Sequence, residues 1–156
     1  MSHRDAQRRQ QAGFTLTELV MVLILIGVLA AGAALRAGFG DVTVSAQARQ
    51  VARDLRHTQL LAMTEGRTLR FESLGTSYRV TDTVSPVIDP ATGADFVVNL
   101  EDGARLSAGT LDFDSLGRPV SGGSLVAGVS SFTLSGASQS ARIDIQPVTG
   151  FASVTP

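Results

Sequence analysis

A single carboxylate stands at the edge of a long apolar segment near the N-terminus. Glu18 directly precedes Leu19–Leu35, a run of seventeen residues without a charge. An ionised acid inside a membrane segment costs on the order of 2.5 to 3.5 kcal/mol at the helix centre, so such groups usually have a designated partner. Glu18 is therefore predicted to pair with a cation when it leaves water.

The flanks of the apolar run predict a membrane anchor. Its length is at the lower edge of the roughly 17 to 25 residues that span a bilayer. The first thirteen residues carry three Arg and one Asp, a local charge of +2, which favours a cytoplasmic leader by the positive-inside rule. Everything after Arg36 is then expected in the periplasm or outside the cell.

A secretory signal peptide is the alternative interpretation of this segment. Its small-residue cleavage site would follow the apolar stretch, and Leu29–Ala33 has a suitable composition. The segment Gly13–Glu18 argues against it, because a glycine ends the polar leader before the apolar run begins and a carboxylate follows. An ordinary signal peptide has no use for Glu18.

Residues 12–34, which include GFTLTELVMVLILIGVLAA, closely resemble the class III signal of type IV pilins and type II secretion pseudopilins. The resemblance implies a leader peptide of residues 1–13, cut between Gly13 and Phe14 by a prepilin peptidase that also N-methylates Phe14. It also implies that Glu18 meets the N-terminal ammonium of a neighbouring subunit during assembly, in a low-dielectric helix bundle that strengthens the pair.

The same resemblance implies a location and a set of partners. The protein would be a single-pass protein of the bacterial inner membrane with a periplasmic C-terminal domain, and would then enter a periplasmic or surface filament. Its partners would be other pilin or pseudopilin subunits, the prepilin peptidase/methyltransferase and the inner-membrane assembly platform.

One position departs from the family pattern. Many pilins have a proline where this chain has Leu35, and a proline would kink the helix by removing a backbone hydrogen bond. Gly27 and Gly32 are weaker points in the helix, and Gly38 and Gly40 are candidates for a flexible joint. The sequence leaves open whether the helix bends here.

A second helical segment follows the apolar one, over residues 41–66. Its apolar residues recur at helical spacing and form one stripe, and its other face carries Arg49, Arg53, Arg56 and Glu65, with Gly66 as a C-terminal stop. We interpret it as the second half of one long helix whose first half, residues 14–36, spans the membrane and mediates assembly. The stripe consists of Val44, Ala48, Val51, Leu55 and Ala62.

Residues 67–156 show the pattern of a β-rich domain. Short β segments alternate with turn clusters such as Asp89–Gly93 and Ser121–Ser124. The fold class is therefore predicted to be α+β and pilin-like, with a long N-terminal helix packed on a C-terminal antiparallel sheet. The expected strands are Thr68–Glu72, Tyr78–Asp82, Phe96–Leu100, Thr110–Phe113, Ser131–Leu134 and Arg142–Gln146.

Two strand-turn segments sharpen the resemblance. Leu111–Pro119 and Ile143–Phe151 look like units of the minor pseudopilin H and minor pilin T group. Together with IDPATGADFVV they are similar to a minor pilin of the mannose-sensitive haemagglutinin system.

Other chemistry is weakly represented in the chain. It has no cysteine, which excludes disulfides and thiolate metal sites. His57 follows Asp54 on one helix face, but no nucleophile motif accompanies them. Asp82, Asp89 and Asp95 are too dispersed for a compact calcium loop and are interpreted as turn residues. We expect no catalytic, metal or cofactor site, and no enzymatic activity.

The charge balance favours a structural role over binding of nucleic acid. After loss of the leader, ten Arg face thirteen acids, a charge of −3, which is not the basic field that phosphate backbones select. The predicted function is a minor pilin or pseudopilin. The alternatives are a filament-borne binding module for DNA, a secreted substrate or a surface, and an exported enzyme with an uncleaved anchor.

Overall fold

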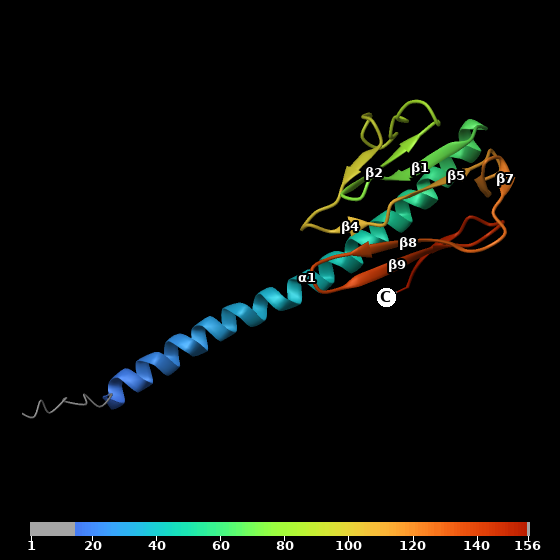
Figure 1. The fold of residues 1–156 in the computed structure, drawn as a ribbon. Helices are drawn as coiled ribbons and strands as arrows, with labels where there is room; N and C mark the ends of the chain where they lie inside the picture. Colours follow the sequence, from blue (N-terminus) through green and yellow to red (C-terminus); the bar gives the residue numbers. More distant parts are fainter. Residues whose placement is uncertain (1–14, 156) are drawn as a thin grey trace, which may run out of the picture. The chain divides into compact units, whose positions relative to one another are not determined.

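The computed structural model describes residues 15–155, with the side chains of residues 31–42 excepted. One helix, α1 (Leu16–Glu65), is followed in the described residues by ten short strands (Figure 1). The chain divides into two compact units, Met1–Ala37 and Gly38–Pro156. All the strands belong to the second unit.

The strands form two sheets, and every pairing in them is antiparallel. The six-stranded sheet has the order β3-β2-β1-β5-β6-β7 and consists of β1 (Leu69–Ser73), β2 (Ser77–Thr81), β3 (Val97–Asn99), β5 (Gly109–Phe113), β6 (Pro119–Ser121) and β7 (Ser124–Leu125). The four-stranded sheet has the order β10-β9-β8-β4 and consists of β4 (Arg105–Leu106), β8 (Ser130–Ser135), β9 (Ser140–Ile145) and β10 (Ala152–Thr155).

The second half of α1 is amphipathic, as predicted. Val44 is 6% exposed and the other four residues of the predicted apolar stripe are fully buried, while the predicted charged face is exposed. Apolar residues that recur every three to four positions lie on one side of a helix. That side packs into the core that the helix shares with both sheets.

Three aromatic rings connect the two sheets in the core. Phe71 of β1 stacks on Tyr78 of β2 with the ring centroids 5.1 Å apart. It meets the ring of Phe132 in β8 edge-on at 5.3 Å. Each aromatic pair adds about 0.5 to 1.5 kcal/mol beyond the burial of its surface, so Phe71 is a central packing residue of this unit.

Polar side chains of α1 bind backbone groups of the loops and of β10. The Gln47 amide donates to the Glu101 carbonyl at 3.2 Å and accepts from the Glu101 N–H at 3.0 Å. The Arg56 guanidinium donates twice to the Ala152 carbonyl, at 2.6 and 2.9 Å. These contacts satisfy backbone groups that would otherwise lose their hydrogen bonds on burial, and they fix the helix against both parts of the unit.

Gln59 joins two turns to the same helix. Its side-chain amide donates to the carbonyls of Gly117 and Thr149, both at 2.7 Å. Gly150 lies between them, because a Cβ there would come within 2.6 Å of both the Gln59 amide and the Gly117 carbonyl. A glycine is therefore required where the two turns approach the helix.

The helix ends at Glu65 because of Gly66. Gly66 has a φ of 66°, and the Arg67 N–H donates to the Ala62 carbonyl at 3.2 Å. This six-to-one hydrogen bond after a left-handed glycine is the Schellman motif. The predicted C-terminal stop is confirmed.

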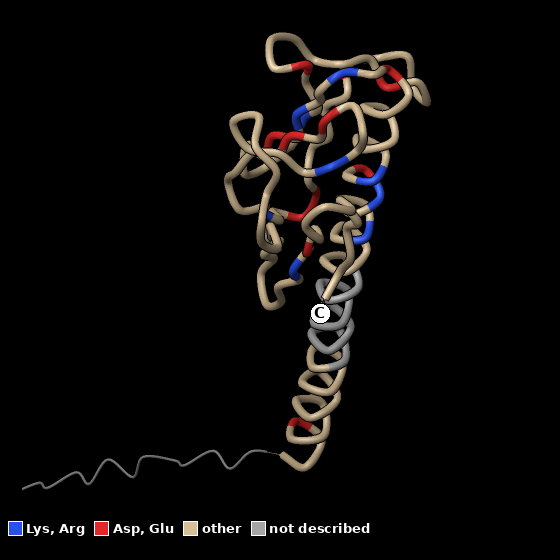
Figure 2. Tube along the Cα trace, turned by 90° about the vertical axis from the view of Figure 1, so that its right-hand side faces the viewer, with Lys and Arg blue, Asp and Glu red and all other residues tan. Residues whose placement is uncertain are grey.

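Charges of both signs are interspersed over the sheets (Figure 2). Five Arg residues of the second unit form short ion pairs, of which Arg70 with Asp112 is a two-bonded pair at 2.7 and 2.9 Å. The side chains of these pairs remain partly exposed, so each contributes only about 0 to 1 kcal/mol.

The predicted β segments correspond to β1, β2, β3, β5, β8 and β9, each displaced by no more than two residues at either end. The segments β4, β6, β7 and β10 were not predicted, because each has only two to four residues, too few for a visible alternation. The predicted turn at Ser121–Ser124 is confirmed. Its two serines pair with each other across the β6–β7 hairpin.

Candidate assembly site

The predicted processing residues and the predicted assembly residue fall in different parts of the chain. Gly13 and Phe14 lie outside the described residues, which begin at Thr15. Glu18 lies in the first turn of α1, and its side chain is exposed. The structure therefore describes the assembly residue and its local support.

Thr15 is the N-cap of α1. Its hydroxyl accepts a hydrogen bond from the Glu18 N–H at 3.2 Å, and its carbonyl accepts one from the Leu19 N–H at 3.1 Å. Thr15 and Glu18 thus have the spacing and one of the two bonds of a capping box. The pattern Thr-x-x-Glu is visible in the sequence, so this local role of both residues was detectable there and was missed.

The capping geometry also places Glu18 in a favourable electrostatic position. The unpaired N–H groups at a helix N-terminus carry a partial positive charge, which stabilises a nearby carboxylate by about 0.3 to 1 kcal/mol. This is small compared with the cost of burying an unpaired acid in a membrane or a helix bundle. Capping alone does not compensate for removing Glu18 from water.

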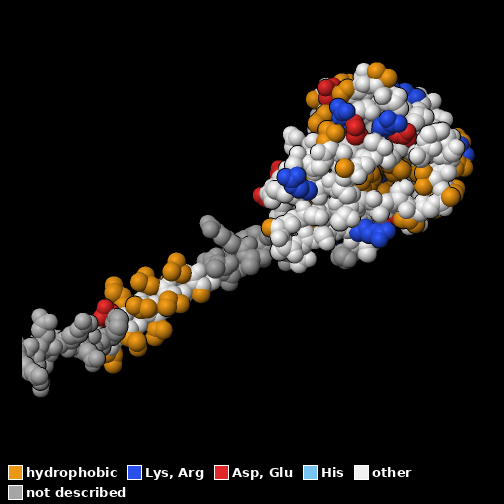
Figure 3. Space-filling view, viewed as in Figure 1, with side chains coloured by type: hydrophobic (Ala, Val, Ile, Leu, Met, Phe, Trp, Pro, Cys, Tyr) orange, Lys and Arg blue, Asp and Glu red, His pale blue; other side chains and the backbone are white. Residues whose placement is uncertain are grey.

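The helix around Glu18 is apolar on every side and uncovered. Eleven large apolar side chains between Leu16 and Leu29 are 44% to 80% exposed, and Figure 3 shows them along this segment. A helix that is hydrophobic all round is normally buried. Among the described residues, no helix is long and apolar enough to cross a membrane.

His57 and Asp54 each contact a different aromatic residue of the β-rich domain. The Tyr78 hydroxyl donates to the Asp54 carboxylate at 2.5 Å, and the His57 ring packs on Phe96 with centroids 5.6 Å apart. Burial raises the pKa of Asp54 and outweighs the opposing effects of the Tyr78 hydrogen bond and of nearby Arg53. Burial also raises the pKa of Tyr78, and its bond to Asp54 acts in the same direction.

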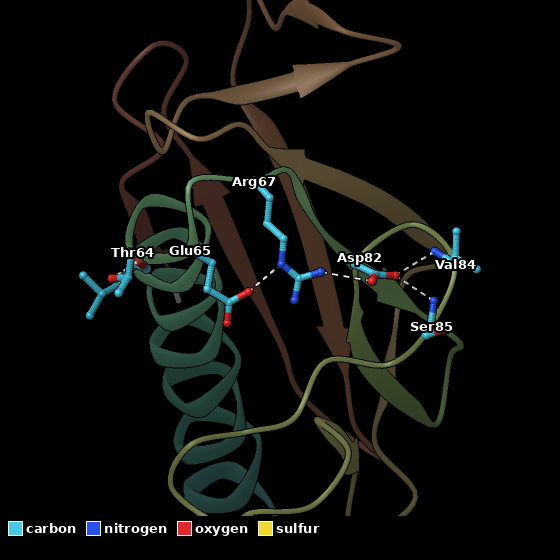
Figure 4. Close-up of polar contacts among 7 residues, drawn as sticks. Thr64, Glu65, Arg67, Asp82, Val84 and Ser85 are labelled. Carbon is cyan, nitrogen blue, oxygen red and sulfur yellow. Dashed lines mark hydrogen bonds and ion pairs between the residues drawn. The ribbon is translucent and has the colours of Figure 1, made fainter.

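Two of the three dispersed acids, Asp82 and Asp89, serve as turn residues, and Asp82 also forms an ion pair. Asp82 accepts from the N–H groups of Val84 and Ser85 and pairs with Arg67, which also contacts Glu65 (Figure 4). The two backbone bonds, followed by Arg67, lower the pKa of Asp82.

Asp89 likewise caps a turn, since its carboxylate accepts from the Ala91 N–H and the Thr92 hydroxyl. Within the described residues, His, Asp and Glu form no group of three that could hold a metal ion.

Comparison with known proteins gives a motif and a fold. Residues 8–34 match the prokaryotic N-terminal methylation motif. No curated protein sequence matches the chain. Two crystal forms of the type IV minor pilin FimU of Pseudomonas aeruginosa are structurally similar, with TM-scores of 0.52 and 0.51 and sequence identities of 12% and 13%.

The structural likeness extends over most of both molecules. Each match covers 72% of this chain, and 88% or 92% of the FimU chain. At this identity the likeness shows the fold, which is the predicted α+β arrangement of a helix on antiparallel sheets. The comparisons therefore show a prokaryotic N-terminal methylation motif in residues 8–34 and a fold similar to that of a type IV minor pilin.

Proposed function

We propose that the chain is a minor subunit of a type IV pilus or a type II secretion pseudopilus. It is made as a precursor with leader residues 1–13, anchored through residues 14–36, and cut between Gly13 and Phe14 before assembly. The observation that carries the proposal is an uncovered apolar helix with a single carboxylate in its first turn.

The exposed apolar side chains need a lipid bilayer or another protein to remove them from water. Fully burying one large apolar side chain contributes about 1.5 to 3 kcal/mol, so the eleven side chains from Leu16 to Leu29 correspond to on the order of 20 kcal/mol. Within the unit that ends at Ala37, the described residues offer them no cover. A bilayer satisfies them before assembly, and a bundle of equivalent helices satisfies them in a filament.

Cleavage at Gly13 creates the cation that Glu18 is predicted to neutralise. The new ammonium at Phe14 is one residue before the N-cap, Thr15, where the partial charge of the helix is already positive. In a bundle, a carboxylate on a neighbouring helix relieves this accumulation of positive charge. The pair also sets the register of neighbouring subunits, because only one offset brings the two charges together.

Two observations support a minor subunit over a major one. The similar solved structures are of a minor pilin. The two segments that resemble the H and T group, Leu111–Pro119 and Ile143–Phe151, contain the two turns that Gln59 joins to the helix. Both segments therefore take part in the same contact with the helix, through the side chain of Gln59.

The proposal is tested by the N-terminus of the mature protein. Mass spectrometry of the protein from membranes is expected to show a chain that begins with methylated Phe14. In Gly13→Ala, the precursor is expected to accumulate, because the peptidase must accommodate the backbone beside the scissile bond and glycine is the smallest residue. Gly27→Ala is the matched control, since no atom lies within 4 Å of the added methyl group.

A chain that starts near Ala31 or Ala34 would indicate a secretory signal peptide and contradict the proposal. Wild-type amounts of mature protein in Gly13→Ala would remove the support for this cleavage site.

A further inference from the structure

The outer face of the second half of α1 is a single line of exposed residues. From residue 43 to residue 63, every exposed position belongs to a series with spacings of three, four, three, four and three. This is the spacing of a coiled-coil seam. We call this series the α1 seam, and its members are Ala46, Arg49, Arg53, Arg56, Leu60 and Met63.

The two cations at the centre of the α1 seam form no ion pair within residues 15–155, although Arg53 lies near the carboxylate of Asp54. The side chains of Arg49 and Arg53 enter none of the ion pairs or side-chain hydrogen bonds found among residues 15–155. Five Arg residues on and beside the sheets, in contrast, each pair with a carboxylate. Figure 2 shows the basic positions following one another along the helix.

Arg49 stands between two hollows on the surface of the second unit. One, of about 320 Å³, is bordered by Val44, Ala141 and other residues of α1, β9 and β10. The other, of about 580 Å³, lies between the helix and the loop that carries Glu101 and Asp102. A ridge with a groove on each side is the shape into which the side-chain rows of another helix fit.

The C-terminal end of the α1 seam is apolar. Leu60 and Met63 are 60% and 51% exposed, and Leu116 of the adjoining turn is 63% exposed. Gly117 brings this turn against the helix, since a Cβ there would come within 2.6 Å of the Met63 sulfur. The α1 seam therefore offers cations in its middle and a small apolar surface at its end.

The charge of the α1 seam argues against a second copy of this chain. Two seams packed face to face would bring Arg53 of each copy close to Arg residues of the other, in either direction. Like charges in close contact repel one another and suppress such partners. The helical spacing, the cations and the apolar end together specify the complementary surface.

We infer that the α1 seam binds an amphipathic helix of a different protein, one that presents carboxylates to Arg49 and Arg53 and apolar side chains to Leu60 and Met63. Glu101 and Asp102 border one side of the contact, so the partner is expected to carry a cation on that flank. The inference rests on the proposed function in one respect, which is that both proteins meet on the same side of the membrane.

Site-specific photo-crosslinking in intact cells that make the full chain tests this inference. A photoreactive amino acid is placed at Leu60, and at Thr110 as an exposed control position on β5. Crosslinked peptides are then identified by mass spectrometry. The expected product at Leu60 joins the chain to a segment of another protein with acidic residues at heptad spacing, and Thr110 does not give it.

Charge variants then test whether the α1 seam pairs with carboxylates of the partner helix. Arg53→Glu is expected to reduce this crosslink about tenfold or more, since it places like charges in contact. Arg105→Glu makes the same change at an exposed position outside the α1 seam and is expected to leave the yield unchanged. Replacing the partner's mapped carboxylate by Arg is expected to restore the crosslink with Arg53→Glu.

Crosslinks from Leu60 only to a second copy of this chain or to lipid, or no crosslink, would overturn the inference. Equal crosslink yields in Arg53→Glu and wild type would also overturn it. The same holds if replacing the partner's carboxylate by Arg does not restore the crosslink with Arg53→Glu. The mature N-terminus is measured in the same membranes. Correct processing without the expected crosslink refutes the α1 seam alone, whereas incorrect processing refutes the proposed function.

Discussion

The two regions of the molecule use the same apolar residue types in opposite ways. In the unit that begins at Gly38, the large apolar side chains form a core in which Phe71, Leu55 and Ile143 have no exposed surface. Between Leu16 and Leu29, similar side chains are all exposed. Hydrophobic content therefore predicts burial, but it does not say whether the burying surface belongs to the same chain.

The two regions also differ in whether their charged side chains are paired within the chain. The globular unit neutralises most of its Arg residues internally, through pairs such as Arg70 with Asp112. The apolar segment from Leu16 to Leu29 contains one charged residue, Glu18, and its described contact is the capping bond made by its backbone N–H. We therefore expect substitutions in the globular unit to affect stability, and substitutions in the apolar segment to affect assembly.

The largest expected difference in stability comes from Phe71→Ala. Removing this ring from a closed core is expected to lower the free energy of unfolding by about 3 to 5 kcal/mol. Leu23→Ala, at a position that is 60% exposed, is the control and is expected to change it by less than about 0.5 kcal/mol. The measurement is urea denaturation of the full chain in detergent. Tyr78, the only tyrosine in a chain without tryptophan, provides the fluorescence signal.

Equal losses of unfolding free energy in Phe71→Ala and Leu23→Ala would contradict the proposed difference between the two regions. They would mean that the apolar segment shares a cooperative core with the globular unit.

A glycine pair gives an intermediate effect. Gly66→Ala forces an alanine to adopt a φ of 66°, which is expected to cost about 1 to 2 kcal/mol. Gly27→Ala replaces a glycine inside a helix and is expected to favour the helix locally, by up to about 1 kcal/mol, without changing the unfolding of the globular unit. The same denaturation experiment distinguishes them, and an unchanged midpoint in Gly66→Ala would argue against the left-handed cap.

The smallest effect is a pH dependence from Asp54. Its pKa is raised in the folded chain above the ordinary value of 3.8, so the folded state retains this proton to a higher pH than the unfolded state. The associated stability is fully present below pH 3.8 and is lost as the pH rises through the raised pKa. Asn at this position cannot ionise, and its amide oxygen can still accept the bond from Tyr78.

The free energy of unfolding of Asp54→Asn, minus that of wild type, is therefore expected to increase with pH above about 3.8 and then level off. The groups facing Asp54 are Arg53, His57, Tyr78 and Asp89. The opposite acid dependence of Asp82, whose pKa is lowered, is common to both proteins and cancels in the difference. A flat difference, measured by circular dichroism in urea over this range, would mean that burial does not perturb Asp54.

Periodicity was sufficient to predict the elements that are long or bury one face. The stripe from Val44 to Ala62 and the stop at Gly66 follow from helical spacing and from the left-handed conformation that glycine allows. The strands near Phe71 and Ile143 follow from alternation of buried and exposed positions. These signals depend on neighbours in the sequence, so they are visible without a structure.

The remaining features depend on contacts between distant residues. The division into two sheets requires the pairing of β4 with β8, whose residues Arg105 and Ser135 are far apart in the chain. The contacts of Gln59 with Gly117 and Thr149 have no local signature either. At the candidate site, the acid in an apolar context and the leader pattern were visible, whereas the role of Thr15 as an N-cap was visible but overlooked.

We expect Glu18 to act in assembly and not in folding of the subunit, and a comparison of three variants tests this. Glu18→Gln keeps a residue suited to the third position of a capping box but removes the charge, and Glu18→Asp keeps the charge. Glu18→Val removes both and is expected to insert normally in the membrane, since valine favours a bilayer core.

The measurement is the amount of each variant in sheared filaments, or in crosslinked complexes with other pilin subunits, relative to its amount in membranes. We expect the Gln and Val variants to be processed but to lose incorporation, because leaving the neighbouring ammonium unpaired costs about 3 to 5 kcal/mol. The Asp variant is expected to retain part of the incorporation. Wild-type incorporation of Glu18→Gln would mean that the charge of Glu18 has no role in assembly.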